Sequence, residues 1–132
     1  MYSLKQAEEL VDSGQPDDRY VWFDADTLVY LAALKMETFD LPVECAEDMM
    51  TDMYERFKKR ISEECWLDEP IIISCFSDSH TFRNRLTATY KANRKGKWKP
   101  NYIRTLRNAY SKQFVSVFEP NYEADDLVAI LQ

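Results

Sequence analysis

Three short, mainly apolar runs stand out along the chain, at 20–23, 71–76 and 114–118. Each run is rich in β-branched or aromatic residues, and polar residues follow it. This pattern is typical of strands that are buried on both faces of a parallel sheet. The runs therefore predict three strands.

The segments between the runs carry apolar residues at three- and four-residue spacing, which predicts helices. A short amphipathic helix is expected over about 3–12. A second helix is expected to be capped by Asp26-Thr27 and to run to about 34 or 36. Its predicted buried face carries Leu28, Leu31 and Ala32.

Three further helices are expected, over about 44–64, over about 101–110, and from Asn121 to the end of the chain. In the first of these, apolar side chains recur on one face at Met49, Met53, Tyr54, Phe57 and Ile61. Strands that alternate with helices predict an α/β fold, with a small, mainly parallel sheet in the middle of three layers. The 132 residues are expected to form a single domain, because they are too few for two ordinary ones.

The hydropathy pattern excludes a membrane protein. The longest apolar stretches, such as 28–34, fall far short of the roughly 20 residues that a spanning helix needs. The first ten residues lack the basic start and apolar centre of a secretory signal, so we expect a cytoplasmic protein. Three cysteines without CxxC spacing are expected to be free, small core residues.

The charge is unevenly distributed along the chain. Between Thr81 and Lys112 there are ten Lys and Arg residues and no acid, so this block carries +10 and the remainder −16. Five aromatic residues are interleaved with these cations, an arrangement typical of segments that bind single strands by stacking and charge. Lys95 and Lys97 are expected to contact a nucleic-acid backbone. A plain solvated basic surface is the alternative.

Acidic residues follow the predicted strands. Asp24 and Asp26 come directly after the first run, and Asp78 follows the second. Because ligands bind beyond the carboxyl ends of parallel strands, these acids are expected at one edge of the sheet.

More acids, Glu123, Asp125 and Asp126, open the last predicted helix. Acids in a first turn also complement the helix dipole, which would account for one or two of them. Clustered carboxylates without His or Cys suit Mg²⁺ or Mn²⁺, and one or two such ions can drive phosphodiester cleavage.

Four motifs in this order resemble the 5′-3′ exonuclease and flap endonuclease family, which includes the 5′ nuclease domain of bacterial DNA polymerase I and the exonucleases of tailed bacteriophages. The motifs are Val-Trp-Phe-Asp24, Ser-Asp78-Ser-His-Thr-Phe-Arg83, Tyr90-Lys91-Ala-Asn-Arg94-Lys95 and Tyr-Glu123-Ala-Asp125-Asp126. The resemblance spans about 20–132 and is strongest to the phage members. It implies a PIN-like nuclease core with a basic, arch-like segment at about 81–100.

The resemblance also implies roles for individual residues. Asp24, Glu123, Asp125 and Asp126 would be metal ligands, and Asp78 another, directly or through water. Asp24 and Asp125 would thereby be catalytic. In the arch, Lys91 and Arg94 would contact the scissile phosphate and would also be catalytic. Tyr90 would stack on the terminal base, and Arg83 would support this site or contact the phosphate backbone.

The implied reaction is Mg²⁺-dependent hydrolysis of DNA at 5′ ends, flaps or duplex ends, with RNA primers as a further substrate. A phage protein of this kind would act in the host cytoplasm. Family members continue into a Gly-Asp-x-Asp motif and a helix-hairpin-helix region, which these 132 residues do not contain.

Three interpretations therefore stay open. The chain is expected to be a nuclease core whose remaining ligands lie in a C-terminal half or a second chain. The alternatives are a binding module for nucleic acid or protein on the same fold, and a PIN-type ribonuclease.

Overall fold

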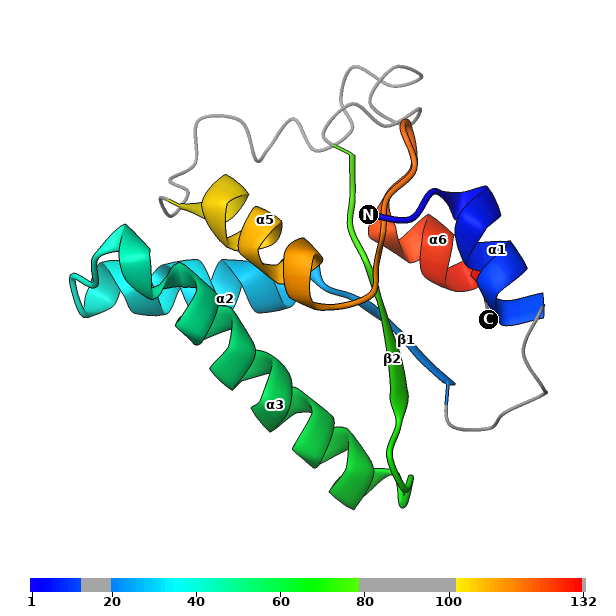
Figure 1. Cartoon of the computed structure of the whole chain (residues 1–132), viewed down its shortest axis with the longest axis horizontal. Helices are drawn as coiled ribbons and strands as arrows, with labels where there is room; N and C mark the ends of the chain where they lie inside the picture. Colours follow the sequence, from blue (N-terminus) through cyan, green and yellow to red (C-terminus); the bar gives the residue numbers. More distant parts are fainter. Residues whose placement is uncertain (13–19, 79–101, 132) are drawn as a thin grey trace.

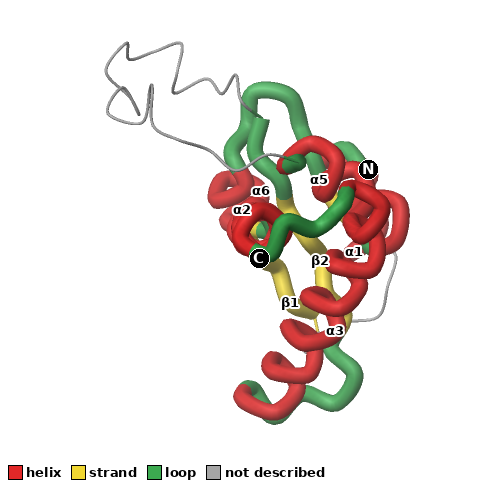
Figure 2. The backbone as a smooth tube through the Cα atoms, turned by 90° about the vertical axis from the view of Figure 1, so that its left-hand side faces the viewer, coloured by secondary structure: helices red, strands yellow, loops and turns green. Residues whose placement is uncertain are grey.

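The computed structural model describes residues 1–12, 20–78 and 102–131 (Figure 1). Strands β1 (Tyr20–Asp24), β2 (Ile71–Cys75) and β3 (Ser116–Val117) form one parallel sheet in the order β1-β2-β3. The last residues of the strands are in register, Asp24 opposite Cys75 and Cys75 opposite Val117. Figure 2 shows β1 and β2 running side by side. The predicted small, parallel α/β sheet is confirmed.

Helices cover both faces of this sheet, as Figure 1 shows. One face carries α2 (Asp26–Thr38), α3 (Ala46–Glu64) and α5 (Ile103–Gln113), with the 3₁₀ turn η1 (Val43–Cys45) leading into α3. The other face carries α1 (Leu4–Asp12) and α6 (Ala124–Leu131). In the described part of the chain, no helix combines the length and the hydrophobicity needed to cross a membrane.

Successive side chains of β2 and of the residue after it belong alternately to the cores on the two faces of the sheet. Ile73 and Cys75 are fully buried against α1 and α6. Phe76 is fully buried against α2, α3 and α5, and Ser74 faces the same side, where its hydroxyl pairs with that of Tyr110 at 2.5 Å. Successive side chains of a strand point to opposite faces, so this short strand holds together the two halves of the molecule.

The N-terminus is fixed by a capping box. The Ser3 hydroxyl accepts a hydrogen bond from the Gln6 N–H, and the Gln6 side chain accepts one from the Ser3 N–H. Just before it, Tyr2 forms a parallel bridge with Val117 of β3. The Tyr2 N–H donates to the Ser116 carbonyl at 2.8 Å, so the first residues extend the sheet beyond β3.

The predicted buried face of α2 is correct at Ala32 and Leu28, which packs against the core, and wrong at Leu31. Leu31 is 47 % exposed, and the buried residues of α2 are Val29, Ala32, Ala33 and Met36. This i, i+3, i+4, i+7 set faces α3 and α5 and carries the helix on to Thr38, beyond its predicted end. The predicted cap is also wrong, because Ala25 occupies the N-cap position without a side-chain bond.

The third strand is shorter than predicted, because Phe114 ends α5 and stacks on Tyr54 with ring centroids 3.7 Å apart. Helix α6 begins at Ala124 rather than near Asn121. Asn121 has a φ of 76°, a left-handed conformation that Asn tolerates and that a helix excludes.

The expectation of three core cysteines holds only for Cys75. Cys45 is partly buried and Cys65 is exposed, since both lie at the ends of α3 rather than on its packed face. All three are free, as predicted.

Candidate carboxylate site at the sheet edge

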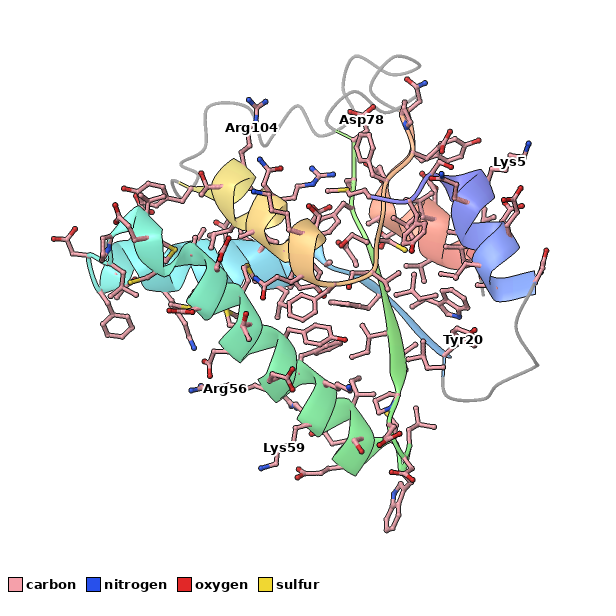
Figure 3. All side chains as sticks on the ribbon, viewed as in Figure 1. Lys5, Tyr20, Arg56, Lys59, Asp78 and Arg104 are labelled. Carbon is pink, nitrogen blue, oxygen red and sulfur yellow. The ribbon has the colours of Figure 1, made fainter. Side chains whose placement is uncertain are left out.

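Six acids occupy the edge of the sheet where the strands end, and we call them the carboxylate edge. Figure 3 shows Asp78 beyond the end of β2, at the opposite end of the sheet from Tyr20, where β1 begins. The acids come from the end of β1, the start of α2, the segment after β2 and the start of α6. They are Asp24, Asp26, Asp78, Glu123, Asp125 and Asp126.

Backbone N–H groups bind several of these carboxylates. The Asp24 carboxylate accepts a hydrogen bond from the Asp26 N–H at 3.0 Å, across the turn between β1 and α2. The Asp78 carboxylate accepts one from the Asn121 N–H at 2.8 Å, and the Asp78 N–H donates to the Tyr122 carbonyl at 3.0 Å. Asp78 therefore joins the end of β2 to the loop before α6, in which Asn121 has a positive φ.

The start of α6 also has a capping-box contact. The Asp126 carboxylate accepts a hydrogen bond from the Glu123 N–H at 3.1 Å, as the side chain at position N3 of a capping box does. Glu123 is only 6 % exposed, whereas Asp125 lies on the exposed side of the helix. The backbone of Glu123 and the side chain of Asp126 are thus in contact, and Asp125 faces solvent.

Ser77 connects both faces of the sheet at this edge. Its N–H donates to the Asp26 carboxylate at 2.8 Å, and its hydroxyl accepts from the Ala124 N–H at 2.9 Å. The first bond anchors the start of α2, and the second anchors the start of α6, which lies on the other face.

A half-buried arginine on α5 completes the edge. Arg107 donates from Nη2 to the Ser77 carbonyl at 2.9 Å, and its guanidinium lies 4.8 Å from the ring centre of Phe76 and 5.2 Å from that of Phe118. Burial lowers the pKa of Arg107, and the charges of Asp26 and Asp78 act in the opposite direction. An arginine stays protonated at any pH of interest, so this group is a fixed positive charge beside two carboxylates.

The nearest thiol is unsuited to metal binding. Burial, with a smaller contribution from the Asp24 charge, raises the pKa of Cys75 to about 12. Cys75 is also fully buried in the core beneath α1 and α6, so its sulfur is not presented at the edge. The donors of the edge are therefore carboxylate oxygens, the ligands that Mg²⁺ and Mn²⁺ prefer.

The chemistry of these donors fits a divalent ion, but their spacing does not form a ready-made site. Within residues 1–12, 20–78 and 102–131, no three His, Cys, Asp or Glu side chains are grouped closely enough to hold one metal ion. The carboxylates serve instead as acceptors for backbone N–H groups. A carboxylate has about four lone-pair positions, so one such bond does not exhaust its capacity to bind a cation.

Comparison of the chain with protein-family models, with curated proteins and with solved structures finds no match. The likeness to 5′ nucleases therefore rests on the motifs quoted above. The described residues contain the acids of these motifs, whereas the predicted nucleic-acid contacts lie outside them: Arg83, Tyr90, Lys91, Arg94, Lys95 and Lys97.

Sequence reasoning missed Ser77 and Arg107 as members of the edge. Arg107 carried a usable signal, because it lies four residues after Ile103 and three before Tyr110, on the packed side of an amphipathic helix. Arginine is rarely buried without a partner, so its position in that stripe indicates an acid nearby. Ser77 carried no such signal, since its role depends on backbone contacts that a sequence does not display.

Proposed function

We propose that this chain is the core of a divalent-metal-dependent nuclease that hydrolyses DNA phosphodiester bonds at 5′ ends or flaps. The observation that supports the proposal best is the convergence of acids from three separate parts of the chain on one edge of a parallel sheet. Like charges repel one another, so such a cluster needs compensating positive charge. A bound cation would supply it.

Asp24, Asp78, Glu123, Asp125 and Asp126 are the proposed ligands of one or two Mg²⁺ or Mn²⁺ ions. Such an ion, when bound, lowers the pKa of water and stabilises the leaving oxygen. The chain's own contribution is to hold the carboxylates at the edge through the bonds from Asp26, Asn121 and Glu123. Since no three acids in the described ranges form a ready-made group, binding would require small side-chain rearrangements.

Lys91 and Arg94 are the proposed contacts to the scissile phosphate, and Tyr90 the proposed stacking residue. The basic segment begins close to the edge along the chain. Arg83 follows Asp78 by five residues in the sequence. Cations in this segment are expected to draw the phosphate backbone toward the carboxylates.

The first experiment is cleavage of a 5′-labelled flapped duplex, and of a single strand, by the purified chain in Mn²⁺. Asp125→Asn is the informative variant, because Asp125 is exposed and its replacement removes a charge with little effect on packing. Asp68→Asn is the matched control, since Asp68 is equally an exposed aspartate but precedes β2, at the other end of the sheet. Cleavage that is lost in Asp125→Asn and retained in Asp68→Asn supports the proposal.

Lys91→Ala tests the basic segment separately. It is expected to leave Mn²⁺ binding unchanged and to lower the rate of cleavage, because a phosphate contact is lost while the carboxylates stay in place. Unchanged turnover in this variant would remove Lys91 from the proposed site.

A nucleic-acid-binding module is the second candidate. The observation that favours it is the use of the carboxylates as acceptors for backbone N–H groups, which gives them a structural role without any metal. Retention of the flapped duplex on the chain, with no cleavage in Mn²⁺ or Mg²⁺, would show binding without catalysis by this chain alone, as expected of a binding module or of a nuclease core that needs ligands from another segment or chain.

A further inference from the structure

Three contacts of Ser77 converge from three helices. Its N–H binds Asp26 of α2, its hydroxyl binds the Ala124 N–H of α6, and its carbonyl binds Arg107 of α5. Two of these helices lie on one face of the sheet and α6 lies on the other. The position of this one residue therefore determines how the ends of β2, α2 and α6 meet.

The contact from Arg107 differs from the other two because it brings a charge. Removing a guanidinium from water is costly unless hydrogen bonds and opposite charges compensate for it. Here the Ser77 carbonyl supplies the hydrogen bond, and Asp26 and Asp78 supply opposite charge from beyond salt-bridge distance. The rings of Phe76 and Phe118 complete the surroundings, and stacking on aromatic faces suits a planar guanidinium better than an ammonium.

We propose that Arg107 is the positioning residue of the carboxylate edge. Its guanidinium is the built-in counter-ion of Asp26 and Asp78 and, through the Ser77 carbonyl, fixes the end of β2 relative to α2 and α6. Only the consequence for metal binding rests on the proposed nuclease function, because the counter-ion role concerns the folded chain alone.

In this role, Arg107 positions the acids before a metal ion binds. The acids are held near one another before any cation arrives, because Arg107 offsets part of their mutual repulsion. A divalent ion then meets carboxylates that are already anchored, which lowers the entropy that binding must remove. Loss of Arg107 therefore affects metal binding in two opposing ways. The carboxylates attract the ion more strongly, but they are less well placed to bind it.

A double-mutant cycle on the full chain, unfolded by urea without divalent ions, tests the counter-ion role. Asp26→Asn and Arg107→Met are each expected to lower the folding equilibrium constant by about tenfold or more, and the double variant by clearly less than the product of the two losses. If the losses multiply, Asp26 and Arg107 act independently and the proposal is overturned. Should Arg107→Met not fold, Arg107→Gln replaces it in the same cycle.

Mn²⁺ affinity of the folded variants then separates positioning from simple charge. Arg107→Met is expected to weaken Mn²⁺ binding by about tenfold, as supporting residues around metal ligands commonly do, although it removes a nearby positive charge. Arg107→Lys is expected to recover part of that loss. Arg104→Met is the matched control, because Arg104 lies on the same helix but is exposed, as Figure 3 shows, and it should alter binding by less than about twofold.

Stronger Mn²⁺ binding by Arg107→Met than by the unaltered chain would show that Arg107 merely repels cations, which contradicts a positioning role. If the unaltered chain binds no Mn²⁺, the proposed nuclease fails on its own account. The double-mutant cycle then still decides whether Arg107 is the counter-ion of the edge.

Discussion

The core beneath α2, α3 and α5 and the carboxylate edge lie next to each other, yet opposite kinds of contact hold them. The core is made of fully buried apolar side chains such as Met36, Met50, Phe76 and Leu106, whose attraction depends on area and shape rather than direction. The edge is made of hydrogen bonds from backbone N–H groups to carboxylates, which depend on direction and distance. The core is therefore expected to tolerate substitutions of similar volume, whereas the edge should depend on individual atoms.

The two regions meet at Phe76. One side of its ring belongs to the core, where it packs edge-on against Tyr110 with centroids 5.7 Å apart, and Arg107 lies over the ring on the side of the edge. A packing defect in the core can therefore reach the edge through this ring.

The largest expected effect concerns a purely apolar core position. Leu106→Ala should lower the free energy of unfolding by about 2–5 kcal/mol, because it removes a fully buried side chain and leaves a cavity. Leu106→Met, which nearly conserves volume, should lower it by less than about 1.5 kcal/mol. Urea denaturation measures both. If Leu106→Ala and Leu106→Met lower the unfolding free energy equally, the core does not tolerate even a substitution of similar volume.

A polar pair inside the core sharpens the comparison. Ser74→Ala leaves the Tyr110 hydroxyl buried without its partner and should lower the free energy of unfolding by about 1–3 kcal/mol. The double variant Ser74→Ala, Tyr110→Phe removes both partners and should be more stable than Ser74→Ala alone, by the same denaturation measurement. A double variant that is no more stable would mean that the hydroxyl of Tyr110 gains little from Ser74.

At the edge, the hydrogen bond and the charge of Asp78 can be separated. Asp78→Ala should cost about 1–2 kcal/mol of unfolding free energy, because the Asn121 N–H loses its acceptor in a half-buried position. Asp78→Asn keeps an acceptor oxygen and should cost less than half of that, while lowering Mn²⁺ affinity as much as Asp78→Ala does. If both variants lose equal stability, the charge of Asp78 holds the loop rather than its hydrogen bond.

The smallest expected effect is a dependence of the unfolding free energy on pH, which comes from the thiol of Cys75. The pKa of Cys75 rises from 9.0 to about 12 on folding, so the folded chain favours the protonated thiol. This contribution is complete below pH 9 and is lost as the pH rises toward 12, at about 1 kcal/mol between pH 8.5 and pH 10. Cys75→Ala should therefore show a shallower fall in unfolding free energy over that range. Identical slopes would mean that the pKa of Cys75 is the same in the folded and the unfolded chain.

Much of the fold was predictable because its elements have strong periodicity. The apolar runs at 20–23 and 71–76 predicted β1 and β2, and the stripe through Met53 and Phe57 predicted α3. In α2 only Leu31 was wrongly predicted to be buried. Apolar residues lie on all sides of this helix, and its contacts with α3 and α5 decide that Val29 rather than Leu31 is buried. The start of α6 was missed because Asp78 holds Asn121 in a turn from 43 positions away.

The candidate site was predictable to a different extent. The rule that ligands gather beyond the carboxyl ends of parallel strands placed Asp24 and Asp78 at one edge of the sheet, where the structure has them. The metal-ligand roles of these acids stay predictions. Ser77 gave no sequence signal and Arg107 indicated only an unspecified acid nearby, since their contacts depend on how α5 and α6 pack on opposite faces of one sheet.

The bonds between carboxylates and backbone amides have a spectroscopic consequence. The amide protons of Asp26, Ser77, Asn121 and Glu123 each point at a carboxylate oxygen. Their nuclear magnetic resonance frequencies will therefore respond to any ion that draws electron density from those oxygens. Titration with diamagnetic Mg²⁺ in a ¹⁵N-labelled sample would report, amide by amide, which carboxylates the ion engages and in what order.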